Sequence, residues 1–242
     1  MEAQTRPSAE AVAHRALSLV SVLFRDNLER AIALEQRPRA VVEKLNTLLK
    51  EWMDREGVRE RLSKRESALM EIALGGWDDR AVADISWRVE AVGMLLWSVG
   101  VIDAVAPYDQ MFALEDVMPT LGVFSETAPL MGRLSARSDE VLQRQRDIAE
   151  VWHWRARAAE LQRRSGLAPA PQNLQNALGR AQAAGAFDSV PSCGDLLAFG
   201  KPYRELTAEE ATTCAVIARE RYLALNWMCG RSADWDETAI DT

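Results

Sequence analysis

The feature that most constrains the fold is an almost uncharged stretch from Ser86 to Gly100, with the sequence SWRVEAVGMLLWSVG. No side chain from Ala91 to Ile102 carries a charge, and apolar residues occur on every side of the helical wheel. A helix that is apolar all round is surrounded by protein. The uncharged run is about a dozen residues long, shorter than the roughly 18–20 residues that a membrane span needs. It therefore predicts a helix at the centre of a protein core, with Trp87 and Trp97 among its core residues.

Most of the remaining chain has the period of amphipathic helices, in which apolar residues recur every three or four positions. Capping boxes at Ser63 (SKRE) and Thr207 (TAEE) each predict the start of a helix. We expect helices over residues 8–36, 38–57, 63–73, 86–100, 138–164, 173–184 and 207–230, with one further helical turn at 111–118. Asp78 or Asp79 is expected to cap the segment that leads into the helix over 86–100. Leu196 to Phe199 is expected to form a short strand. The fold class is therefore all-α: an irregular multi-helix bundle of about seven helices around a central apolar helix, with at most a minor short strand pair.

We expect residues 1–242 to form a single helical domain. A division at the 165–171 linker, with the sequence SGLAPAP, is the alternative, because proline and glycine favour a linker there. The segment from Val101 to Arg137 is the least regular part of the chain, since Pro107, Pro119 and Pro129 interrupt it. A loop of that length in a compact domain is functional or mobile.

The formal net charge of −7 disfavours a nucleic-acid partner, because phosphates are bound by clustered Lys and Arg. An acidic surface suits a basic protein partner, although many acidic proteins have none. The three cysteines form no C-x-x-C pair, which indicates a reducing compartment, and residues 1–8 lack the pattern of a signal peptide. We therefore expect a cytoplasmic protein with no membrane segment. The oligomeric state is not indicated.

Glu90 is the first candidate site residue, because it is the one carboxylate in the apolar run. A buried carboxylate must be paired, hydrogen-bonded or protonated, and buried acids with shifted pKa values are common at active sites. The alternative is a structural ion pair with one of four arginines that lie on other expected helices: Arg155, Arg157, Arg219 or Arg221.

Glu150 and His153 form the second candidate, because their i, i+3 spacing places them on one helix face. Di-iron bundles use two such Glu-x-x-His motifs and two further glutamates, whereas this chain has one copy. His14, the other histidine, has Ala11 where the motif requires an acid. We therefore assign no metal, and we expect His153 to form hydrogen bonds within a helix interface.

The third candidate is the acidic C-terminal segment with Asp234, Trp235, Asp236 and Asp241. Close carboxylates could hold Ca²⁺ or Mg²⁺, but the glycine and the distant glutamate of an EF-hand loop are absent. Two alternatives are that Trp235 docks this segment on the core while the acids stay solvated, or that the acids bind a basic partner. No nucleotide-binding, zinc-protease or serine-hydrolase motif occurs, so neither a cofactor nor a catalytic residue is assigned.

Several blocks of the chain resemble a known family. These are GDLLAFGKPYREL, RERYLALNWMCG and the ending DWDETAIDT, with the looser middle blocks WRVEAVGMLLWSVG and RDIAEVWHWRAR. Together they are similar to the bacterial family catalogued as domain of unknown function 4272, over most of residues 9–242. The resemblance implies a helical intracellular bacterial protein, and it implies no activity, substrate or catalytic residue.

Two functions follow as hypotheses. The preferred one is a non-catalytic protein-binding module, toxin-neutralising or regulatory, that contacts a basic protein. Its expected contact residues are Asp103, Tyr108, Asp109, Glu115, Asp116 and the C-terminal acids. The alternative is a metal-dependent or acid–base enzyme with Glu90, Glu150 and His153 around one pocket. A third hypothesis, a purely structural module, is supported only by the lack of a more specific sequence motif.

Overall fold

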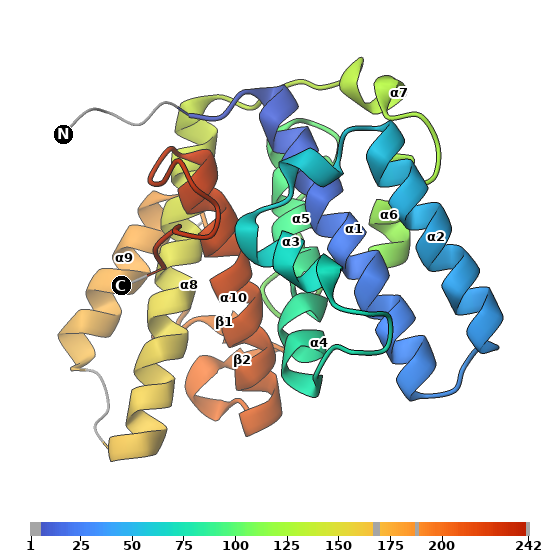
Figure 1. Cartoon of the computed structure of the whole chain (residues 1–242). Coiled ribbons are helices and arrows are strands. Elements are labelled where there is room, and N and C mark those ends of the chain that lie inside the picture. The colour runs from blue at the N-terminus through green and yellow to red at the C-terminus, as the bar shows by residue number, and fades with distance from the viewer. Residues whose placement is uncertain (1–5, 167–169, 187–188, 241–242) are drawn as a thin grey trace.

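The computed structural model describes residues 6–166, 170–186 and 189–240, and its regular structure is almost entirely helical (Figure 1). The prediction of an all-α fold is confirmed. The helices are α1 (Ala9–Ala33), α2 (Arg39–Arg55), α3 (Lys64–Glu71), α4 (Asp79–Ser86), α5 (Arg88–Ser98), α6 (Leu114–Leu121), α7 (Ala128–Met131), α8 (Asp139–Ser165), α9 (Pro171–Ala183) and α10 (Ala208–Met228). Short 3₁₀ helices occur at Arg59–Arg61 and Tyr203–Glu205. The expected short strand is β1 (Leu197–Ala198), which pairs with β2 (Lys201–Pro202).

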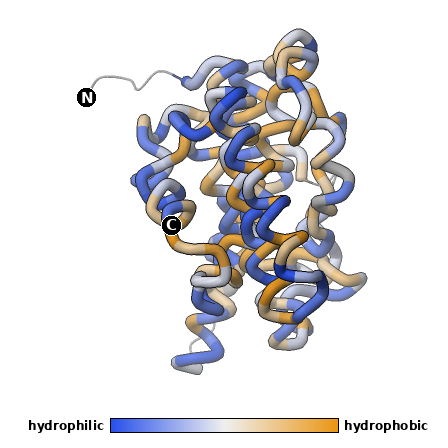
Figure 2. Tube along the Cα trace, turned by 45° about the vertical axis from the view of Figure 1, so that its right-hand side comes forward, coloured by the Kyte–Doolittle hydropathy of each residue, from blue (hydrophilic) through white to orange (hydrophobic). Residues whose placement is uncertain are grey.

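Helix α5 lies at the centre of the molecule, as its composition predicted. Every residue from Val89 to Ser98 is buried. One side of α5 packs against α1 and the other against α10, which in turn packs along α8 (Figure 1). Hydrophobic and hydrophilic residues alternate along the turns of many helices (Figure 2), as expected of helices with one face toward protein and one toward water. The apolar run is therefore central because its neighbours bury apolar stripes against it.

The expected helix over residues 86–100 is α5, and the segment that leads into it forms a helix of its own, α4, which meets α5 at Trp87. The Trp87 backbone caps the C-terminus of α4 and precedes the first residue of α5. The change of direction lets α4 pack against α1 while α5 enters the core. The Trp87 side chain is half-buried at this corner, so its expected place in the central core is wrong, whereas Trp97 is buried.

Both predicted capping boxes are present. The Ser63 hydroxyl accepts a hydrogen bond from Glu66 N, and the Glu66 carboxylate accepts one from Ser63 N. Thr207 and Glu210 form the same reciprocal pair at the start of α10. Each box satisfies two of the backbone N–H groups that a helix start leaves without an intrahelical partner.

No described helix is both long enough and apolar enough to cross a membrane. The helices α8 and α9, on either side of the predicted linker, pack against each other. Residues 167–169 of that linker lie outside the described residues, so the single domain and its alternative division stay predictions.

Gly93 on α5 allows the segment after this helix to pack closely. A Cβ atom at this position would lie 2.3 Å from Cδ2 of the Phe112 ring. We expect Gly93→Ala to lower the free energy of unfolding by about 1–3 kcal/mol, because the ring or the helix must shift. Gly179→Ala on α9 is the matched control: a Cβ there meets nothing within 4 Å, so alanine should stabilise that helix slightly. Urea unfolding of both variants measures the two effects, and equal stability of the Gly93 variant and the native protein would contradict the packing argument.

Candidate functional site

Glu90 forms an ion pair inside the core. Its Oε2 atom lies 2.8 Å from Nε of Arg221 on α10, and both side chains are 0% exposed. Of the four arginines considered, Arg221 is therefore the partner. Burial raises the pKa of Glu90 above its usual value, while the charge of Arg221 and the hydrogen bond from Phe112 N oppose that rise. The pair belongs to the hydrophobic core and is not at the wall of an open pocket.

The same two side chains hold the segment that follows α5. Arg221 donates hydrogen bonds to the carbonyl oxygens of Ala106 and Gln110, and Phe112 N donates to Glu90 Oε1 at 2.7 Å. The Arg221 guanidinium also lies over the Tyr108 and Phe112 rings, 4.8 and 5.0 Å from their centroids. We call Glu90 and Arg221 the loop clamp, because together they fix residues 106–112 to the core.

Further contacts hold the rest of the segment between α5 and α8. Arg137 donates to Trp97 O at 2.8 Å and to Asp103 O at 3.0 Å. Glu56, the residue that caps the C-terminus of α2, accepts hydrogen bonds from both the backbone N–H and the hydroxyl of Thr127. This segment contains α6 and α7, and the predicted helical turn at 111–118 is instead α6, which starts at Leu114. Its later start is consistent with the hydrogen bond from Phe112 to Glu90, which ties the preceding residues to the core.

Two other predicted site residues have structural partners. Asp109 Oδ2 accepts a hydrogen bond from the backbone N–H of Phe199 at 2.6 Å, in the turn that joins β1 and β2. Arg155 pairs with the buried carboxylate of Asp195 through two hydrogen bonds of 2.8 Å. Both contacts join segments that are distant in sequence, so these side chains stabilise the fold.

Glu150 and His153 lie on α8 and line different cavities. Glu150 pairs with Arg146 and Arg180 beside α9. His153 stacks on the Tyr222 ring at 5.5 Å and lines a cavity between α8 and α10. The contacts of Glu90 are with Arg221 and Phe112, so the structure does not arrange the three predicted residues around one pocket. Within the described ranges, no group of three or more His, Cys, Asp or Glu side chains is placed to hold a metal ion.

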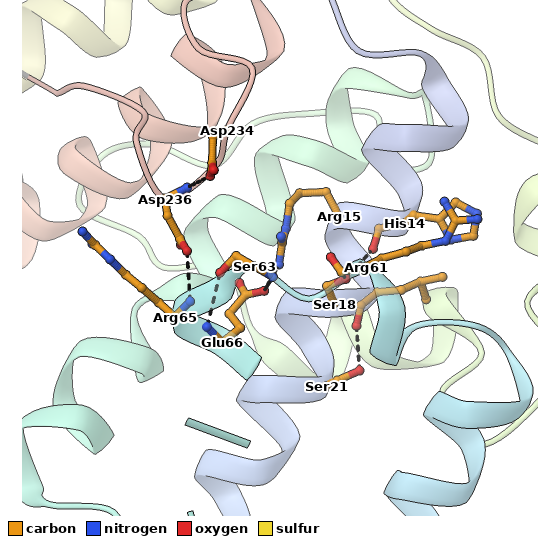
Figure 3. Close-up of polar contacts among 11 residues, drawn as sticks. His14, Arg15, Ser18, Ser21, Arg61, Ser63, Arg65, Glu66, Asp234 and Asp236 are labelled. Atoms are coloured by element: carbon orange, nitrogen blue, oxygen red, sulfur yellow. Dashed lines mark hydrogen bonds and ion pairs between the residues drawn. The ribbon is translucent and has the colours of Figure 1, made fainter. Parts of the chain in front are cut away.

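The C-terminal segment folds back onto the core at Trp235, but the Asp236 carboxylate takes part in this docking, unlike in the alternative that left the acids solvated. Figure 3 shows the Asp236 carboxylate at the backbone of Arg65, whose N–H donates to it at 3.0 Å in the first turn of α3. Asp234 in turn accepts from Asp236 N at 2.8 Å. Trp235 is buried, with its ring 5.5 Å from that of Trp227 and edge-on to it. Asp241 lies outside the described residues.

Sequence reasoning missed the charged residues beneath this segment. Arg15 on α1 is buried and pairs with the Glu66 carboxylate (Figure 3). Its guanidinium carbon also lies 5.2 Å from the centre of the Trp235 ring. Glu66 was expected only as a capping residue, and nothing in its local sequence indicates the second role. Burial and the charge of Arg61 lower the pKa of the adjacent His14, so its imidazole is neutral at pH 7.

The three cysteines are free. Burial raises the pKa of the Cys214 thiol to about 12, and it also raises the pKa of Cys229. A thiol is nucleophilic as the thiolate, so these two side chains stay protonated and pack as small apolar groups.

A family model described as Domain of unknown function (DUF4272) matches residues 1–180. No curated protein and no solved structure gives a significant match. The matched range includes the middle blocks of the resemblance, WRVEAVGMLLWSVG and RDIAEVWHWRAR, whereas the C-terminal blocks lie beyond it. The match covers well over half of the sequence, and so the chain belongs to the family described as domain of unknown function DUF4272.

Proposed function

We propose that this chain is a non-catalytic protein-binding module that contacts a basic protein through residues 101–137. The observation that carries the proposal is the loop clamp, in which the buried pair of Glu90 and Arg221 fixes residues 106–112 to the core. A loop held in one conformation loses less conformational entropy when it binds a partner. The charged pair between α5 and α10 thus supports a recognition surface, and this accounts for a carboxylate in an otherwise apolar helix.

The composition of the segment fits a basic partner. Residues 101–137 contain five carboxylates and two arginines. Asp103, Glu115 and Glu126 are exposed, and so are two apolar side chains, Met111 at 46% and Phe124 at 37%. Exposed apolar groups and charges of one sign are both used in protein interfaces, in which the charges speed association and select the partner.

This surface is smaller than the sequence suggested. Tyr108 is buried and stacks on Trp152, and Asp109 binds the backbone of Phe199. The C-terminal acids Asp234 and Asp236 take part in docking their own segment. The side chain of Asp116 is among those that the structure does not describe. The proposed contacts are therefore Asp103, Glu115 and Glu126, with the two exposed apolar side chains.

The concrete form of the proposal is a cytoplasmic partner of a basic protein, either a toxin that it neutralises or a protein that it regulates. The three free cysteines agree with a reducing compartment.

The test compares partner capture by two charge-reversed proteins. We expect the native chain to retain a basic protein from its host at low salt and to release it as salt rises. The variant Asp103→Lys/Glu115→Lys/Glu126→Lys should lose that protein, since like charges now face it. The control, Glu209→Lys at an exposed position on α10, should retain it. Retention by the triple variant, or loss by both variants alike, would reject this surface.

A further inference from the structure

A second feature lies on another part of the molecule: the cavity between α8, α10 and the C-terminal segment. Its volume is about 430 Å³, within the range of small-molecule sites. His153 and Arg157 line it from α8, Val216 and Arg219 from α10, and Ile240 from the C-terminal segment. The hydrogen bond from Asn226 to Ala239 O, at 2.9 Å, holds the residue next to Ile240 in place. None of these residues belongs to the surface proposed for protein binding.

The charged wall of this cavity is basic, although the chain as a whole is acidic. Arg157, Arg163 and Arg219 line it together with a single carboxylate, Glu160. The Glu160 carboxylate is divided between two arginines. Its oxygens lie 3.5 Å from a guanidinium nitrogen of Arg157 and 2.7 Å from one of Arg164, which is outside the cavity.

The positive charge of Arg219 is also only partly balanced by its carboxylate partner. Its partner Glu220 is fully buried and accepts a 2.8 Å hydrogen bond from Arg88 as well. Arg163 forms no ion pair with any carboxylate in the described part of the chain. Positive charge therefore exceeds negative charge at this wall, and guanidinium groups bind carboxylate, sulfonate and phosphate oxygens with charge-assisted hydrogen bonds.

Apolar residues line the cavity as well. These are Ala156, Ala215, Val216 and Ile240, and the polar residues Thr212 and His153 complete the lining. An inorganic anion alone would leave the apolar part of the lining exposed to water, whereas an anion that carries an apolar group would cover it.

We propose that this cavity binds a small organic anion, with its charged group at Arg163 and Arg219 and its apolar body against Val216 and Ile240. The inference does not depend on the proposed protein-binding function, because the two surfaces share no residue.

The probe for this site is 1-anilinonaphthalene-8-sulfonate, an organic anion whose fluorescence rises on binding. We expect saturable binding to the intact native chain and displacement by sodium octanoate. Octanol lacks the charge and inorganic phosphate lacks the apolar body, so neither should displace the probe at the same concentration. Displacement by octanol as strong as that by octanoate would overturn the role of the arginines, and displacement by phosphate alone would overturn the role of the apolar lining.

Amino-acid substitutions test whether the probe binds in this cavity. Arg163→Gln/Arg219→Gln should weaken probe affinity about tenfold or more, because it removes two charge-assisted hydrogen bonds. Val216→Glu should also weaken it, since a carboxylate would then line the cavity. Arg80→Gln, at a largely exposed position on α4, is the control and should bind as the native chain does. Thermal melts of all variants show that each is folded. Native affinity in the folded double variant would overturn the proposed site.

Discussion

Arg221→Ala is expected to lower the free energy of unfolding by about 3–5 kcal/mol, because it leaves the buried Glu90 carboxylate without its partner. The variant also removes the hydrogen bonds to Ala106 O and Gln110 O, so residues 106–112 lose part of their attachment to the core. Urea unfolding measures the loss of stability. Amide hydrogen exchange of these residues measures the loosening, and both changes are expected together.

The neighbouring residue Arg219 gives a matched control for this prediction. Its side chain is 45% exposed, and its partner Glu220 keeps a second arginine, Arg88, so Arg219→Ala should cost less than about 1 kcal/mol. The double variant Glu90→Gln/Arg221→Met should lose less stability than the summed losses of Glu90→Gln alone and Arg221→Met alone, because no buried charge remains unpaired in it. Strict additivity in this double-mutant cycle would mean that the two side chains do not act as a pair.

Asp195→Ala should lower the free energy of unfolding by a similar amount, about 3–5 kcal/mol, at a second buried ion pair. The carboxylate is fully buried and accepts four hydrogen bonds: two from Arg155 and one each from the backbone N–H groups of Leu196 and Arg204. Removing it leaves the Arg155 guanidinium buried with an unpaired charge. Thermal and urea unfolding of the purified variant give the measurement.

The control for Asp195 is Glu205→Ala, a nearby carboxylate whose side chain is 56% exposed and pairs with Arg204 at 3.6 Å. Solvent screens that pair, so the variant should stay within about 1 kcal/mol of the native protein. A loss below 1 kcal/mol for Asp195→Ala as well would show that the carboxylate does not hold Arg155 in the core.

The sequence was informative wherever a local pattern decides the structure. The period of apolar residues located the helices, the capping boxes located the starts of α3 and α10, and the uncharged run identified α5 as central. It could not identify the partner of Glu90, because Arg221 lies 131 residues away and only the packing of α10 on α5 brings the two together. The change of direction at Trp87 could not be predicted for the same reason. Helix α4 leaves the α5 axis because it packs on α1, and this tertiary contact has no local sequence signal.

For the candidate site, the sequence indicated which charged side chains need partners, but it did not indicate which residues those partners are. Arg155 was considered as a partner for Glu90, yet it pairs with Asp195 from a segment that had no clear pattern. One alternative had Trp235 dock the C-terminal segment while its acids stay solvated. Trp235 is buried, whereas Asp236 binds the start of α3. Such contacts depend on the register of two distant segments, which periodicity does not encode.

The position of α10 has a consequence for how the chain reaches its native state during synthesis. The family match ends at residue 180, but α10 covers α5 and supplies the counter-ion of Glu90 only from residue 208 onward. A nascent polypeptide that stops at the family boundary would leave an apolar helix and its carboxylate facing water. Because α10 lies beyond that boundary, the region that the family model matches does not close the interior around α5 without it.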